Sequence, residues 1–228
     1  YTTLFRSIVA EKSTEKNTHS PLSFRHFVLG AIAIFVYVGV EVGIPNIANL
    51  YMTGDLQINA TTAGTVVGTY WFLMLVGRLT GGVLGSKFSS KSMLSFAAVL
   101  GLVFVLLAIF LPKDQMVSMP VFQSDISFGL AQVPVSIMLL VLCGLCTSVM
   151  WGGIFNLATE GLGKYTAAAS GIFMVMVCGG GIIPAIQGYA ADIFGYVQSY
   201  WVVVIGISYM LFYALVGSKN VNKDIKVD

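Results

Sequence analysis

Six apolar stretches, each long enough to cross a lipid bilayer as a helix, follow one another along this sequence. They run over residues 24–52, 60–84, 92–111, 134–158, 165–190 and 196–217. A bilayer core of about 30 Å needs about 20 apolar residues in helical form, and a helix satisfies its backbone hydrogen bonds within one segment. Charged residues make up only 10% of the chain, against about 25% in soluble domains. The sequence therefore predicts an all-α membrane protein with six transmembrane helices.

The Lys and Arg residues between these stretches predict how the helices are oriented. Ten of the twelve lie on the side that holds the first residues: Arg6, Lys12, Lys16, Arg25, Lys87, Lys91, Lys164, Lys219, Lys223 and Lys226. Lys113 lies on the other side, and Arg78 lies within the second stretch. Because cytoplasmic loops carry an excess of Lys and Arg, both ends of this segment are expected in the cytoplasm.

The same stretches divide the chain into regions. Residues 1–23 are expected to be a cytoplasmic segment, residues 24–217 the six-helix domain, and residues 218–228 a cytoplasmic tail. The segment 112–133 is expected to be a polar outside loop, and Asn59 has the position and chemistry of a helix N-cap. The chain begins with Tyr and shows no signal peptide, so we expect a fragment of a longer protein.

One carboxylate stands near the centre of the first apolar stretch. Glu41 is 16 residues from Arg25 and 14 from Asp55, which in a helix is roughly 20–24 Å from each. A charge at that depth costs about 3 kcal/mol on insertion scales, and such residues usually face a bundle interior or a water-filled path. Glu41 is therefore a candidate for substrate binding and for carrying a proton. The alternative is a protonated structural Glu bonded to a neighbouring helix.

The residues around Glu41 predict a helix that is loosened near its centre. Gly39 and Gly43 form a small-xxx-small pair, and Pro45 removes one backbone hydrogen bond. Asn46 adds a polar side chain one turn further on. A loosened helix beside polar groups is typical of the ligand site of a transporter, so Asn46 joins Glu41 as a candidate for substrate binding.

Arg78 is the second charge inside a predicted span. It lies near the cytoplasmic end of the second stretch, where it can extend toward the interface or bind carbonyls of a neighbouring helix. We therefore expect a structural or gating role for Arg78 rather than contact with substrate. Tyr70, two turns earlier, is expected to be a packing residue.

The fourth and fifth stretches add further candidates. Trp151 and Asn156 lie in "SVMWGGIFNLATEG", and sugars are recognised by a flat aromatic face together with amide and carboxylate groups. Gln187 lies in "VCGGGIIPAIQGYAAD" and is a third candidate for substrate binding. Three consecutive glycines, including Gly180, and Pro184 weaken that helix, which is typical of a helix that moves.

The sequence carries none of the motifs that indicate an enzyme. No nucleophile–base pair, metal-binding motif or phosphate loop is present, and Cys143-x-x-Cys146 stands without a second pair or a nearby His. The two cysteines are expected to be small buried residues. No enzymatic activity, cofactor, metal ligand or nucleic-acid partner is expected.

A short internal repeat divides the six stretches into two sets of three. "GVLGSKF" (82–88) ends the second stretch and "GYAADIF" (188–194) ends the fifth, and both have the pattern G-x-x-x-[S/D]-x-F. The first is expected at the cytoplasmic face and the second at the outside face. This is the arrangement of an inverted three-plus-three repeat.

Longer motifs resemble the major facilitator superfamily. "GGVLGSKFSSK" (81–91) resembles the loop between the second and third helices of each half, with Ser86 where Asp is usual. "FVYVGVEVGIPNIANLYM", "GTYWFLMLVGRLTGG", "SVMWGGIFNLATEGLGKYTAAASG" and "GGGIIPAIQGYAADIFG" together resemble the carboxy-terminal half of the fucose permease-like sugar:proton symporters, in the glucose/galactose branch.

This resemblance implies a half of a transporter in the inner (plasma) membrane of the cell. The transporter takes up a monosaccharide, such as glucose, galactose or fucose, together with a proton. It implies alternating access between this half and a missing amino-terminal six-helix half, with residues 1–23 as the connection. Glu41 matches the carboxylate typical of the glucose/galactose branch on this helix. Two alternatives remain open: an antiporter of drugs or other small solutes with protons, and a six-helix scaffold that transports nothing.

Overall fold

The computed structural model describes residues 19–112, 114–123, 125–222, 224–225 and 227. Most of the expected cytoplasmic segment 1–23 lies outside these residues, as do Arg6, Lys12, Lys16, Lys113, Lys223 and Lys226. All six predicted spans fall within the described part of the chain, and each is long and apolar enough to cross a membrane.

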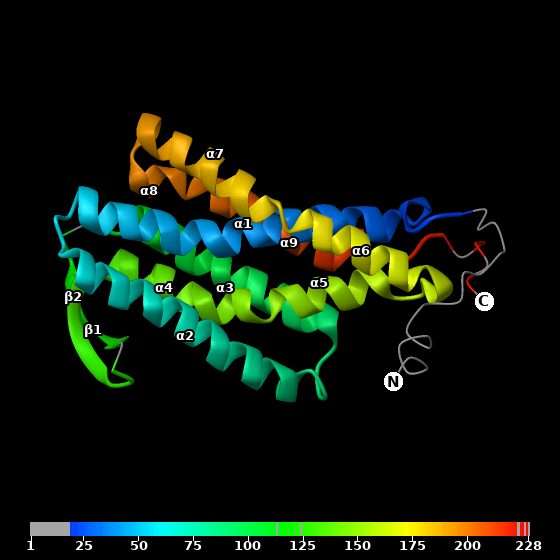
Figure 1. Cartoon of the computed structure of the whole chain (residues 1–228), viewed down its shortest axis with the longest axis horizontal. Helices are drawn as coiled ribbons and strands as arrows, with labels where there is room; N and C mark the ends of the chain where they lie inside the picture. The colour runs from blue at the N-terminus through cyan, green and yellow to red at the C-terminus, as the bar shows by residue number, and fades with distance from the viewer. Residues whose placement is uncertain (1–18, 113, 124, 223, 226, 228) are drawn as a thin grey trace, which may run out of the picture.

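The first three spans are continuous helices (Figure 1). A short helix η1 (Pro21–Ser23) precedes α1 (Arg25–Gly54), and α2 (Ala60–Leu84) and α3 (Ser90–Phe110) follow. The predicted N-cap at Asn59 is confirmed, because its side-chain oxygen accepts a hydrogen bond of 2.8 Å from the backbone N–H of Thr61. Ser89 caps α3 in the same way, accepting from the N–H of Ser92 at 3.2 Å.

The last three spans are each interrupted. The fourth span consists of α4 (Val135–Ser148) and α5 (Met150–Thr159). The fifth consists of η2 (Gly163–Tyr165), α6 (Thr166–Met176) and α7 (Gly179–Phe194). The sixth consists of α8 (Tyr196–Ser199), α9 (Trp201–Phe212) and the π-helical turn η3 (Tyr213–Gly217). The interruption in the fifth span directly precedes the run of three glycines, where the sequence predicts a weakened helix. That span also continues to Phe194, four residues beyond its predicted end.

The segment between the third and fourth spans, which the sequence predicts to be a polar outside loop, forms a β-hairpin. Strand β1 (Met116–Phe122) pairs antiparallel with β2 (Phe128–Pro134). The hairpin is tied to α2, because the N–H of Phe122 donates to Thr69 Oγ1 at 2.8 Å and its ring stacks on Phe72 at a centroid distance of 4.6 Å. It lies at the end of the bundle opposite the two chain ends (Figure 1).

Burial follows the same order in both sets of three spans. In the most apolar part of each span, 67%, 28% and 39% of residues are buried in the first, second and third, and 67%, 17% and 50% in the fourth, fifth and sixth. The first span of each set is thus central and the second is the most exposed. This agreement supports the predicted three-plus-three repeat, and an odd number of spans per set inverts the second set in the membrane.

The described basic residues outside the spans gather at one end of the bundle. This end, called the basic end here, holds Arg25, Lys87, Lys91, Lys164 and Lys219, together with two acidic residues, Glu160 and Asp224. Two hydrogen bonds join segments at this end. The backbone N–H of Arg25 donates to Asn222 Oδ1 at 3.0 Å, and Lys91 Nζ donates to the carbonyl of Leu215 at 3.1 Å. The other, called the hairpin end, holds Asp55, Asp114, Asp125 and Asp192.

Helix α7 packs against α1 through glycines on both helices. A Cβ added at Gly39 would overlap the side chain of Ile183, and one added at Gly179 would overlap the carbonyl of Phe35. A Cβ at Gly181, two residues further along α7, would meet nothing within 4 Å. Small residues therefore let the backbones approach closely along one side of α7 only.

This asymmetry gives a test of the α1–α7 contact. Changing Gly179 to Ala should lower the free energy of unfolding by about 1–3 kcal/mol, because the new methyl group forces the helices apart. The matched change Gly181→Ala should leave stability unchanged or raise it by up to about 1 kcal/mol through helix propensity. Thermal melting of the two variants in detergent compares them, and equal midpoints would contradict the close contact.

Candidate functional site

A cavity of about 800 Å³ extends from the middle of the bundle to the basic end. Its wall includes Glu41 of α1, Arg78 of α2, Ser90 of α3, and Trp151 and Asn156 of α5. Five glycines complete much of the remaining lining: Gly81, Gly82, Gly85, Gly152 and Gly153. A cavity of this size is in the range of small-molecule sites, and the glycines leave room for a ligand close to the backbone.

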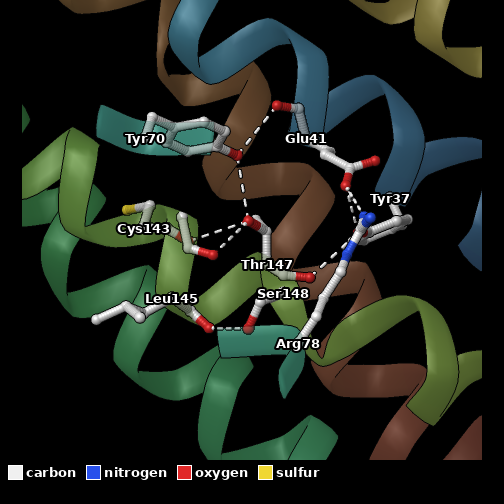
Figure 2. A network of polar contacts seen from close by, with 9 residues as sticks. Tyr37, Glu41, Tyr70, Arg78, Cys143, Leu145, Thr147 and Ser148 are labelled. Atoms are coloured by element: carbon white, nitrogen blue, oxygen red, sulfur yellow. Dashed lines mark hydrogen bonds and ion pairs between the residues drawn. The ribbon is translucent and has the colours of Figure 1, made fainter. Parts of the chain in front are cut away.

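Glu41 and Arg78 form an ion pair in the wall of this cavity (Figure 2). The distance from Arg78 Nη2 to Glu41 Oε1 is 2.7 Å, and the Glu41 side chain is 11% exposed whereas that of Arg78 is 53% exposed. The expectation that Arg78 extends to the interface or binds backbone carbonyls is wrong. The guanidinium turns inward instead, because a carboxylate at membrane depth needs an opposite charge nearby.

Two glycines bring Arg78 within reach of Glu41. A Cβ added at Gly77 would overlap the side chain of Ser148, and one at Gly81 would overlap Val149. Both glycines are buried on the side of α2 that faces α4 and its junction with α5. Their missing side chains let α2 approach closely at the level where Arg78 meets Glu41.

Tyr37 fixes the Glu41 carboxylate from one turn earlier on α1. Its hydroxyl lies 2.8 Å from Glu41 Oε1 and 3.1 Å from the carbonyl of Thr147, and both oxygens accept. Tyr37 is fully buried. One carboxylate oxygen therefore receives hydrogen bonds from a cation and from a phenol, which holds it in a single orientation.

Pro45 accounts for a second contact at Glu41. Proline has no N–H, so the carbonyl four residues earlier, that of Glu41, loses its helical partner. The hydroxyl of Tyr70 takes this place, at 3.0 Å from the Glu41 carbonyl, and it also lies 3.1 Å from Thr147 Oγ1 (Figure 2). Helix α1 continues through Pro45, and Tyr70 replaces the backbone hydrogen bond that the sequence predicts Pro45 to remove. Tyr70 is also more than the packing residue that the sequence predicts.

Trp151 and Asn156, both on α5, also line the cavity. The Trp151 indole meets the Tyr37 ring edge to face, with centroids 6.1 Å apart. Asn156 Nδ2 donates to Ser90 Oγ at 3.3 Å, which links α5 to the start of α3. The structure thus brings together three of the predicted substrate-binding residues, Glu41, Trp151 and Asn156, around one space.

The other two predicted substrate-binding residues do not line this cavity. The cavity extends from Glu41 toward the basic end, whereas Asn46 and Gln187 lie toward the hairpin end of α1 and α7. Asn46 is exposed, and Gln187 is fully buried with its amide against Gly43. Neither amide atom of Gln187 has a hydrogen-bond partner among the described residues.

The predicted gating residues Gly180 and Pro184 lie just beyond the interruption in the fifth span. Gly180 faces Val38 of α1, and Val177, at the interruption itself, lines the cavity. Pro184 removes the helical partner of the Gly180 carbonyl, as Pro45 does for Glu41. The interruption and the proline therefore weaken one stretch of backbone beside the cavity.

The cavity, its intramembrane ion pair and the repeated order of the spans agree with a family match. The sequence matches the Major Facilitator Superfamily over residues 29–224. The chain belongs to this family. Its members are membrane transporters and not enzymes, and the chain is therefore a multi-pass membrane protein of a transporter family.

Curated relatives carry sugar transport in their names. The chain is 32% identical over 217 residues to the "Putative glucose/galactose transporter" of Helicobacter pylori, covering 92% of this chain and 48% of that protein. It is 29% identical to the "Glucose/galactose transporter" of Brucella abortus, covering 91% and 46%. It is 26% identical to the "L-fucose-proton symporter" of Escherichia coli, covering 75% and 35%. The chain thus spans about half the length, or less, of these relatives.

A solved structure has the same fold over a similar share. The crystal structure of the Major Facilitator Superfamily transporter FucP in the outward conformation superposes with a TM-score of 0.71 at 21% identity. The match covers 86% of this chain and 43% of FucP. The predicted six-helix half of a major facilitator fold is therefore confirmed.

The network around Glu41 predicts the effect of removing one hydroxyl. Tyr70→Phe should lower the free energy of unfolding by about 1–3 kcal/mol, because the Glu41 carbonyl loses the bond that replaces its helical partner. Tyr189→Phe is the matched control, since Tyr189 is exposed on α7. Thermal melting in detergent measures both, and a Tyr70→Phe midpoint equal to that of the control would contradict this role.

Proposed function

We propose that this chain is the carboxy-terminal half of a proton-coupled symporter for a monosaccharide such as glucose, galactose or fucose. The observation that carries the proposal is the Glu41–Arg78 ion pair at mid-membrane, in the wall of a cavity that also presents Trp151 and Asn156. The names of the relatives support the class of substrate. Residues 1–23 then connect the two halves, residues 24–217 form the transmembrane domain and residues 218–228 form a cytoplasmic tail.

The ion pair supports a role for Glu41 in proton coupling. A carboxylate that holds Arg78 when ionised releases it when protonated, because the protonated acid loses its Coulomb attraction for the guanidinium. Arg78 then becomes able to move with α2, which agrees with a gating role for this residue. Binding a proton thus changes the contact between α1 and α2 directly.

Trp151 and Asn156 support recognition of a neutral sugar. The indole offers an apolar face to a sugar ring, and the amide and the Glu41 carboxylate offer partners for hydroxyl groups. The only charged side chains among the residues that the structure describes in this cavity wall are Glu41 and Arg78, and these neutralise each other. Asn46 and Gln187 would reach substrate only in a conformation in which the hairpin end is open.

The second half of the transporter is expected against the exposed spans. Only 28% and 17% of the residues in the most apolar part of the second and fifth spans are buried. The chain also spans about half the length of its relatives. A six-helix partner on these faces would close the cavity between the two halves. The basic end would face the cytoplasm of the cell by the excess of Lys and Arg there, in the inner membrane.

Alternating access would use the interrupted spans. The weakened backbone between Val177 and Pro184 borders the cavity and lies against α1 across the glycine contact. Movement of α7 there would open and close the path past Glu41 without unfolding the central helix. Gly180 and Pro184 are the residues that permit it.

The proposal predicts that Glu41→Gln separates accumulation from exchange. In the complete transporter, reconstituted in vesicles with an imposed proton gradient, the variant should lose at least about tenfold of its accumulation of labelled sugar. Exchange of sugar across the membrane without a gradient should continue, because the amide still accepts a hydroxyl hydrogen bond.

Glu160→Gln, at the end of α5 and outside the cavity, is the control for this experiment. It should accumulate sugar as the wild type does. Wild-type vesicles that accumulate none of glucose, galactose or fucose would reject the proposed function and favour an antiporter or a scaffold. Full accumulation by Glu41→Gln would reject its role in coupling.

A second prediction concerns the aromatic wall. Trp151→Ala should raise the KM for the transported sugar about tenfold, since a stacking surface of this kind contributes about 1–2 kcal/mol. Trp201→Ala is the matched control, because Trp201, in α9, packs on Phe110 of α3 and lies outside the cavity wall. Uptake measured against sugar concentration gives both values, and an unchanged KM for Trp151→Ala would exclude it from the binding site.

A further inference from the structure

A second cavity lies on the other side of α2 from Arg78. It has a volume of about 650 Å³ and is bounded by α2, the start of α3 and the end of α4. We call it the α2–α3 groove and define it by Thr80, Leu84, Phe88, Ser92, Phe96 and Leu145. The two cavities share four lining residues: Gly81 on the buried glycine side of α2, and Met93, Ser148 and Val149.

The groove has the depth and the lining of a site for a hydrocarbon chain. Leu84, Phe88, Phe96 and Leu145 are all exposed and apolar. From Ser92 to Leu100 it follows α3 for eight residues, which is about 12 Å at 1.5 Å per residue. Half of a bilayer core is about 15 Å thick, so the groove runs through most of one leaflet.

The end of the groove at the membrane surface is basic. Lys87 directly precedes Phe88, and Lys91 directly precedes Ser92, so both lysines stand beside lining residues. Lys91 Nζ donates to the carbonyl of Leu215, which anchors it at this end of the bundle. Among the described residues neither lysine forms an ion pair with a carboxylate, although Glu160 and Asp224 lie at the same end of the bundle.

We propose that the α2–α3 groove binds one acyl chain of an anionic phospholipid whose phosphate lies against Lys87 and Lys91. The missing half is assigned to the central-cavity side of α2, whereas the α2–α3 groove lies on the side of α2 toward α3. This side, with the exposed Phe96 of α3, then faces the bilayer, and lipid hydrocarbon is the matching occupant. Basic residues at the surface end select an anionic headgroup. The occupied groove supports the back of α2, the helix that carries Arg78 to Glu41. This inference does not depend on which solute the protein transports.

The test uses the full-length protein and two lipids with identical acyl chains, phosphatidylglycerol and phosphatidylcholine. After delipidation, each lipid is added back and the lipid retained on the intact protein is measured by mass spectrometry. The wild type should retain phosphatidylglycerol at least about tenfold better, since each Lys near the surface contributes about fivefold. The double variant Lys87→Gln/Lys91→Gln should lose this preference. Lys164→Gln should keep it, because Lys164 lies at the same end but between α5 and α6, outside the groove lining.

A second variant tests the groove itself. Ser92→Trp fills the groove and should abolish retention of the lipid, whereas Val99→Trp, an exposed position on α3 outside the groove, should not. Size-exclusion chromatography confirms that each variant is folded. Equal retention of the two lipids by the wild type would overturn the proposal. So would retention by Ser92→Trp equal to that of Val99→Trp, because the lipid would then lie elsewhere.

Discussion

An ion pair held at mid-membrane is the constraint on which the rest of this structure depends. A carboxylate at the depth of Glu41 is stable only where an opposite charge and further hydrogen bonds replace water. Arg78, on the neighbouring helix α2, supplies the charge. Tyr37, one turn earlier on α1, supplies a hydroxyl. The glycines Gly77 and Gly81 follow from this requirement, because α2 reaches the pair only by lying close against the fourth span.

Hydrogen bonds of the same network join the first, second and fourth spans. Pro45 frees the carbonyl of Glu41, Tyr70 of α2 binds it, and Thr147 of α4 accepts from Tyr37 and meets Tyr70. The central helix therefore continues through a proline, since the bond that it loses within the helix is replaced from a neighbour. Polar atoms that would weaken a helix in isolation here determine which helices lie side by side.

Much of the fold follows from the sequence, and less of the site does. The length of each apolar stretch determined the six spans, and the side chain of Asn59 marked the start of α2. The pairing of Arg78 with Glu41 joins residues 37 apart and depends on how two helices cross, which periodicity does not describe. Depth and nearby glycines and prolines make Asn46 and Gln187 candidates, but the cavity extends from Glu41 toward the opposite end of the bundle. The hairpin is not evident from the sequence because its alternation is short and broken by Pro120.

The two sets of three spans share one order of burial, yet only the second set is interrupted. The second set is interrupted at Val149 and at Val177–Cys178, well inside the fourth and fifth spans, and at Tyr200, near the hairpin end of the sixth span. A helix bends most easily where its ladder of hydrogen bonds is broken. The second set therefore bends more easily at these points than the first set, whose helices are continuous. The two sets of three spans thus share an order of burial but differ in where their helices can bend.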